Sequence, residues 1–115
     1  MTSGIGTIII PVTDLATAKA VYGELLGVAP VMDESYYVQF QSAGQAVGLD
    51  PNGHKKGMTG PMTYWHVDDL AGRVEALLKA GAEELQAAKD VGGGKLIASV
   101  KDADGNVIGL LQEAA

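Results

Sequence analysis

The chain has 115 residues, which suits one domain, and 47% of them are hydrophobic, as in a globular protein rather than a disordered one. The formal net charge is −6, with eight Lys and Arg residues in the whole chain. This balance argues against a nucleic-acid binder, because phosphate contacts require clustered basic side chains. The absence of cysteine excludes disulfides, a thiolate nucleophile and Cys-type zinc or iron–sulfur sites.

Neither a membrane segment nor a signal peptide is visible in the sequence. The longest apolar run, Ile8–Val12, is far shorter than the roughly 20 residues that cross a bilayer. No basic region followed by an apolar stretch stands at the N-terminus. We therefore expect a soluble cytoplasmic protein with no membrane partner.

The first half of the chain predicts a strand, a helix and three more strands. An apolar run over Thr7–Val12 indicates the first strand, and apolar positions recur at helical spacing from Leu15 to Leu26. Strand-like segments then follow at Val28–Met32, Ser35–Gln41 and Gln45–Asp50.

The second half predicts the same order of elements. Met62–Val67 is the first strand, and Leu70–Leu78 carries a helical pattern. Strand-like segments follow at Ala82–Ala88, Lys95–Lys101 and Asn106–Gln112. Between the two halves, residues 51–61 are rich in Gly, Lys and Pro, which is typical of a linker.

A short repeat marks the start of each helix. Val12-Thr13-Asp14-Leu15-Ala16 resembles Val67-Asp68-Asp69-Leu70-Ala71, which lies 55 residues later. Asp14 and Asp69 are expected to cap the helices, and Gly27 and Gly81 are placed to end them in a left-handed conformation. The sequence thus predicts two βαβββ modules, 5–50 and 62–112, joined by the linker into a single domain over 1–115.

The duplication, the two helix starts and Asp102-Ala103-Asp104-Gly105-Asn106 before an apolar strand resemble the vicinal oxygen chelate superfamily, which groups glyoxalases, bleomycin-binding proteins and extradiol dioxygenases. The resemblance covers essentially the whole chain. It implies an α+β fold in which two tandem modules form a curled mixed sheet around a cleft, with the helices outside. A ferredoxin-like α+β domain is the alternative fold.

Strand alternation sorts the side chains by face. Ile8, Ile10 and Val12 lead into the first helix, and Trp65 and Val67 lead into the second, so these should pack under the helices. The opposite parity is expected to line the cleft. Its ligand-contacting residues are expected to be Thr7, Ile9, Tyr37, Gln39, Met62, Tyr64, His66, Ile97, Ser99 and Gly109.

The resemblance also implies where a metal would sit. Metal-dependent members place ligands in the first and last strand of each module. Here those positions are Thr7, Gly48, Met62 and Gly109, and none is a good divalent-metal ligand. We therefore expect no metal, no other cofactor and no catalytic residue.

One metal site remains open as an alternative, using both histidines. His54 and His66 could act with a carboxylate such as Asp50 or Asp68. The simpler interpretation makes His54 a solvated loop residue and His66 a strand-end residue with hydrogen-bonding partners nearby.

The sequence therefore favours a metal-independent protein that sequesters or carries an aromatic or amphiphilic small molecule. Gly48 and Gly109 are expected to leave room for that ligand. The alternative is a glyoxalase-like lyase, dioxygenase or isomerase with an unusual or absent metal site. A homodimer is expected, because curled sheets leave edges that need covering and related proteins usually pair.

Overall fold

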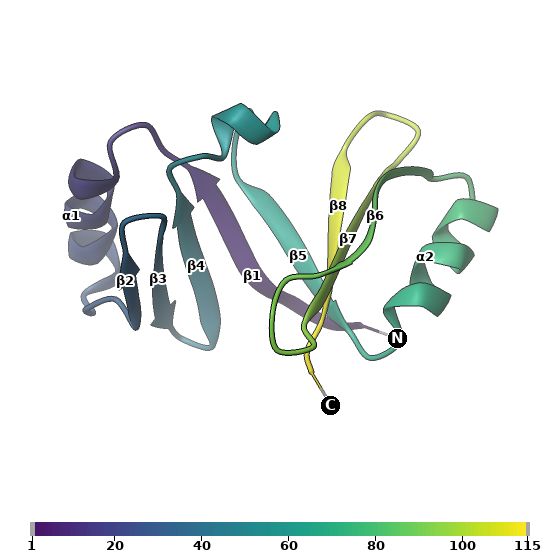
Figure 1. Cartoon of the computed structure of the whole chain (residues 1–115), viewed down its shortest axis with the longest axis horizontal. Helices are drawn as coiled ribbons and strands as arrows, with labels where there is room; N and C mark the ends of the chain where they lie inside the picture. The colour runs from purple at the N-terminus through teal and green to yellow at the C-terminus, as the bar shows by residue number, and fades with distance from the viewer. Residues whose placement is uncertain (1, 115) are drawn as a thin grey trace. The chain divides into compact units, whose positions relative to one another are not determined.

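A computed structural model describes residues 2–114 of the chain. It divides into two compact units, each with one helix and its own strands (Figure 1). Residues 6–62 form the first module, and residues 2–5 together with 63–114 form the second module. The α+β class and the repeated order of elements are as predicted.

The first module holds most of β1 and the elements up to β4. The strands lie in the order β2-β3-β4-β1, and β1 pairs parallel to β4 while the other pairs are antiparallel. A 3-10 turn, η1 (His54–Lys56), lies in the linker. The elements are β1 (Thr2–Pro11), α1 (Leu15–Leu26), β2 (Met32–Glu34), β3 (Tyr37–Ser42) and β4 (Gln45–Asp50).

The second module repeats this arrangement in the order β5-β8-β7-β6, with β5 parallel to β8. Its elements are β5 (Met62–Val67), α2 (Leu70–Lys79), β6 (Glu83–Asp90), β7 (Leu96–Lys101) and β8 (Val107–Gln112). The first residues of β1 join it, because Thr2 Oγ1 donates a 2.8 Å hydrogen bond to the carbonyl of His66. The strands of each module pair in both parallel and antiparallel directions.

Both helices begin at the predicted aspartates. Asp14 and Asp69 each accept a 3.1 Å hydrogen bond from a backbone N–H three residues ahead. The bond from the Thr17 N–H is the main cause that lowers the pKa of the Asp14 carboxyl. Gly27 ends α1 in the left-handed conformation, with φ at 69°. No helix within residues 2–114 has the length and apolarity needed to cross a membrane.

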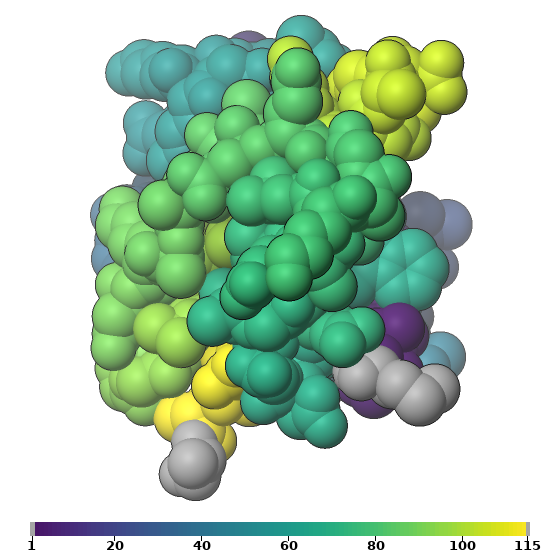
Figure 2. All heavy atoms as spheres, turned by 90° about the vertical axis from the view of Figure 1, so that its right-hand side faces the viewer, coloured from purple at the N-terminus to yellow at the C-terminus, as the bar shows by residue number. Residues whose placement is uncertain are grey.

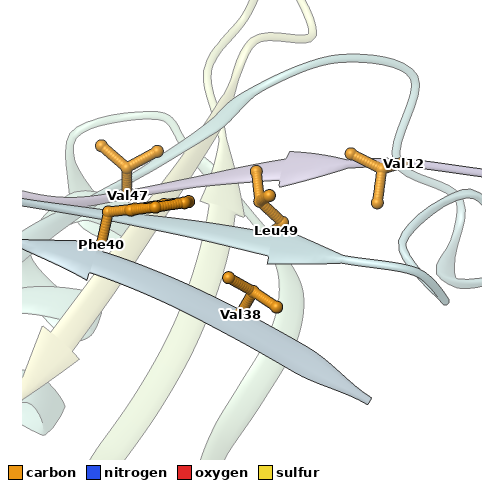
Figure 3. Packing of buried hydrophobic residues seen from close by; sticks show 5 residues of the cluster. All are labelled: Val12, Val38, Phe40, Val47 and Leu49. Carbon is orange, nitrogen blue, oxygen red and sulfur yellow. The ribbon is translucent and has the colours of Figure 1, made fainter. Parts of the chain in front are cut away.

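The core of the first module lies between α1 and one face of its sheet. Val38, Phe40 and Leu49 are fully buried there, and Figure 3 shows them gathered with Val47 and Val12. Each such side chain contributes about 1.5–3 kcal/mol by leaving water. On the helix, the residues packed against this cluster are Leu15, Ala18, Tyr22 and Leu26.

The second module has an equivalent core under α2. Val67, Leu70, Ala98 and Leu110 are buried. Trp65, Val74, Leu77, Leu96 and Ile108 pack around them. The predicted assignment of Trp65 and Val67 to the helix side is confirmed.

The predicted strand over Val28–Met32 is wrong. The strand β2 begins only at Met32 and ends at Glu34, where a turn at Ser35 and Tyr36 leads into β3. Pro30 lacks an N–H and offers no donor to a ladder at its own position. The first bond across to β3 comes from the Val31 N–H to the Gln39 carbonyl, at 2.8 Å.

The Asp102–Asn106 segment that helped to suggest the family closes the turn between β7 and β8. The Asp102 carboxylate accepts bonds from the backbone N–H groups of Asp104 and Asn106, at 3.0 and 2.9 Å. The Asn106 side chain donates a third bond, at 3.0 Å, and is the main cause that lowers the pKa of Asp102. The motif therefore has a local structural role.

Candidate functional site

The strand register of the first module places the predicted site residues on one face. Ile9, Gly48 and Gln39 are laterally paired across β1, β4 and β3, so their side chains share a face. Thr7 and Tyr37 lie two residues away along their strands and share it too. Because the opposite parity packs on α1, this is the helix-free face of the first module.

The second module has its own helix-free face. Tyr64, Gly109 and Ser99 are laterally paired across β5, β8 and β7. His66 and Ile97 flank Leu111 in the next row of the same parity. The sequence prediction of which side chains turn away from the helices is therefore correct within each module. Met62, half-buried, is the last residue of the first module.

A tyrosine covers the glycine on the helix-free face of the first module. A Cβ atom built on Gly48 would lie 2.6 Å from Cζ and 2.7 Å from Cε1 of Tyr37. The Tyr37 hydroxyl is held by a 3.0 Å hydrogen bond to Oε1 of Gln39. Any larger side chain at position 48 would displace this ring from its place.

The second module has the same pairing of ring and glycine. A Cβ atom built on Gly109 would lie 2.8 Å from Cδ1 of Tyr64 and 2.6 Å from the backbone oxygen of Thr63. Gly109 is buried between strands, and Tyr64 is half-buried above it. The space beside each glycine is thus already filled by a side chain of the same module.

This packing corrects the expectation that Gly48 and Gly109 leave room for a ligand. The tyrosine rings take up the volume that the missing side chains release. A ligand on either helix-free face would therefore rest on the tyrosines and not beside the glycines.

A divalent metal does not fit the positions that the family resemblance implies. Gly48 and Gly109 offer no side chain, and a tyrosine ring covers each. Thr7 is buried, and its hydroxyl is a weak ligand. Within residues 2–114, no three His, Cys, Asp or Glu side chains gather in a way that could hold a metal ion.

Asp50 and His54, two of the residues named for the alternative metal site, have other roles in the structure. Asp50 is buried and forms a 2.8 Å ion pair with Lys56, while its other oxygen accepts a bond from the Asn52 N–H. It therefore fastens the linker to the end of β4. His54 begins η1 and is exposed.

Sequence reasoning missed a hollow on the helix side of the second module. A cavity of about 400 Å³ lies between α2 and the sheet, with Trp65 and Arg73 among its lining residues. Ala76 also lines this cavity, and its small side chain on α2 is the feature of the sequence that could have indicated space there.

The family follows from comparison with known proteins. The model of the Glyoxalase/Bleomycin resistance protein/Dioxygenase superfamily matches residues 4–110. The chain belongs to this superfamily. A comparison with curated protein sequences finds no significant match.

Solved structures of the superfamily share the fold. Methylmalonyl-CoA epimerase from Mycobacterium tuberculosis is 19% identical, with a TM-score of 0.71 over 99% of this chain and 90% of that one. A superfamily member from Vibrio splendidus 12B01 is 16% identical, with a TM-score of 0.68 over 93% and 97%. The Mn(II)-bound glyoxalase from Novosphingobium aromaticivorans is 16% identical, with a TM-score of 0.73 over 99% of this chain and 40% of that one.

The glycine substitutions give a test of the covered positions. Gly109→Ala should lower the free energy of unfolding by about 1–3 kcal/mol, as overpacking does, because the Thr63 backbone oxygen cannot move aside. Gly48→Ala should cost less, because the Tyr37 ring can rotate away. Gly60→Ala is the matched control, since its Cβ would meet nothing within 4 Å.

Urea unfolding of single and double variants measures the energetic coupling between each glycine and the tyrosine that covers it. Tyr37→Ala should largely cancel the effect of Gly48→Ala, whereas Tyr64→Ala should relieve Gly109→Ala only in part. Additive effects in the first pair would contradict the packing of Tyr37 on Gly48.

Proposed function

We propose that this member of the superfamily is a metal-independent small-molecule-binding protein that sequesters or carries an aromatic or amphiphilic ligand. The observation that carries the proposal is the tyrosine ring over a glycine in each module, at Gly48 and Gly109. Where the family resemblance implies metal ligands, this chain has an aromatic surface.

The chemistry of the helix-free faces supports such a ligand. Ile9, Tyr37, Tyr64 and Ile97 are all half-buried on strand faces that no helix of their own module covers. Tyrosine faces stack on planar groups and contribute about 0.5–1.5 kcal/mol beyond the buried area. Apolar surface with a few polar points is the usual composition of a small-molecule site.

Gln39 supplies one of those polar points. Its Oε1 already accepts the Tyr37 hydroxyl, and its amide nitrogen bonds no acceptor within the described chain. An amide NH₂ group donates two hydrogen bonds. The proposed ligand therefore carries a carbonyl or hydroxyl oxygen beside its apolar body.

Binding is favoured over catalysis because two of the acidic groups beside these faces are held in ion pairs. Asp50 pairs with Lys56, and Glu83 pairs with Lys101 at 3.4 Å. A general acid–base mechanism needs a carboxylate or histidine positioned to exchange a proton with substrate. Glu34, the lateral partner of Tyr37, lies exposed on the edge strand β2, and His66 already has an interaction partner. The epimerase and glyoxalase named above share the fold, which by itself fixes no activity.

Added divalent metal ions should leave the melting temperature of the protein unchanged. A ligand of the native state at about 100 times its dissociation constant would add about 2.7 kcal/mol, which shifts the melting temperature visibly. We expect no shift with Ni²⁺, Zn²⁺, Mn²⁺ or Fe²⁺ after treatment with a chelator, and far less than one metal per chain by elemental analysis. Stoichiometric metal with a clear thermal shift would contradict the proposal and restore the enzyme alternative.

Ligand binding should depend on Tyr37 and Gln39, which share the helix-free face of the first module. Planar aromatic compounds with a carbonyl or hydroxyl group can be screened by thermal shift and their affinities measured by calorimetry. Tyr37→Ala and Gln39→Ala should each weaken binding of a hit by about three- to tenfold, as the loss of one stacking contact or neutral hydrogen bond does. Lys79→Ala, on the exposed side of α2, is the control and should bind normally. Wild-type affinity in both site variants would show that the ligand lies elsewhere.

A homodimer is part of the same proposal. The edge strand β6 exposes all eight of its residues, and Leu25 and Val31 in the first module are 73% and 65% exposed. Unpaired edges and apolar side chains of this kind favour association. Light scattering at tens of micromolar should give twice the chain mass of 11.8 kDa. A monomer at that concentration, well above a typical micromolar dissociation constant, would count against the dimer.

A further inference from the structure

The cavity of the second module lies on the opposite side of the sheet from Tyr64 and Gly109. Its floor is formed by Trp65 and Val67 of β5 with Ile108 and Leu110 of β8, and Leu77 of α2 closes one side. At about 400 Å³ it falls within the range of small-molecule sites, and far above the size of an ordinary packing defect.

The mouth of the cavity has a different character. Arg73 and Ala76 of α2 and Thr2 of β1 complete the lining, and all three residues are exposed. Figure 2 looks onto this side of the second module, with α2 across the centre and N-terminal residues in purple beside it. The cavity thus has an apolar interior and one cationic side chain, Arg73, at its opening.

Arg73 is available for an anion. It is the one arginine of the chain, and within residues 2–114 its guanidinium takes part in no hydrogen bond or ion pair. The acidic neighbours on α2 are engaged, because Asp69 caps the helix and Glu75 pairs with Lys79 at 3.3 Å. A guanidinium matches the fork geometry of a carboxylate better than any other side chain does.

We propose that this cavity binds a small apolar monocarboxylate, with the hydrocarbon against Trp65 and Leu110 and the carboxylate on Arg73. The site differs from the one under the proposed function, because alternation along β5 sends Trp65 and Tyr64 to opposite faces. Either site can be occupied without the other.

Trp65 makes the proposal directly measurable. It is the only tryptophan in the chain, so tryptophan emission reports on this cavity alone. Octanoate is the probe, and octanol is its uncharged match. Octanoate should shift the Trp65 emission saturably, and calorimetry should give the same dissociation constant. The affinity for octanol should be lower, since it lacks the charge-assisted bond to Arg73.

Matched variants separate the contribution of the Arg73 charge from that of the apolar lining. Arg73→Gln keeps the helix former and removes the charge, and it should weaken octanoate by about tenfold while leaving octanol unchanged. Lys79→Gln removes a cation from the same helix outside the lining and should change neither. Equal affinity for octanoate in wild type and Arg73→Gln would overturn the role of Arg73.

The position of the ligand has its own test. Ala76→Phe fills the mouth and should abolish octanoate binding, whereas Ala80→Phe places the same bulk outside the lining and should not. Tyr64→Ala should bind octanoate normally, which separates this site from the helix-free face. No emission change at millimolar octanoate would overturn the proposal. Conversion of a dimer to a monomer by Ala76→Phe would overturn it in favour of a second copy of the chain as the occupant.

Discussion

The burial of one face of each sheet under a helix decides where every other side chain of the module can go. In the first module, Val38, Phe40 and Leu49 are removed from water against α1. Because a strand alternates strictly, a slip of one residue would carry these side chains to the other face and lose the core. The register is therefore held by hydrophobic burial, and the composition of the helix-free face follows from it.

The two modules reach the same packing of ring on glycine by different routes. Tyr37 lies on β3, two residues before Gln39, the lateral partner of Gly48, so its ring reaches over the glycine diagonally. Tyr64 is itself the lateral partner of Gly109 on the neighbouring parallel strand. Similar surfaces have thus been built from side chains at non-equivalent positions of the repeat. The two modules therefore share their backbone arrangement more closely than they share the side chains on their helix-free faces.

Local patterns in the sequence were enough to predict both helices and most of the strands with their faces, but they placed β2 too early and missed the first five residues of β1. Asp14 and Asp69 mark helix starts because a cap is an interaction over three residues, and period-two alternation needs only the strand itself. The cover over Gly48 could not be predicted in this way, because it depends on which rotamer Tyr37 adopts and on its bond to Gln39. The cavity under α2 likewise depends on how closely a helix approaches a sheet.

The strand β1 belongs to both modules, since residues 2–5 pack with the second and residues from Gly6 onward with the first. Thr2 meets its partner His66 across a separation of 64 residues. On a ribosome that adds about 5–20 residues per second, the N-terminal residues wait several seconds for that partner to appear. The first module can complete its sheet during this interval, before the partner of residues 2–5 has been made. Residues 2–5 thus precede the first module along the chain but reach their place only after it, and their removal would affect the second module and not the one beside them in the sequence.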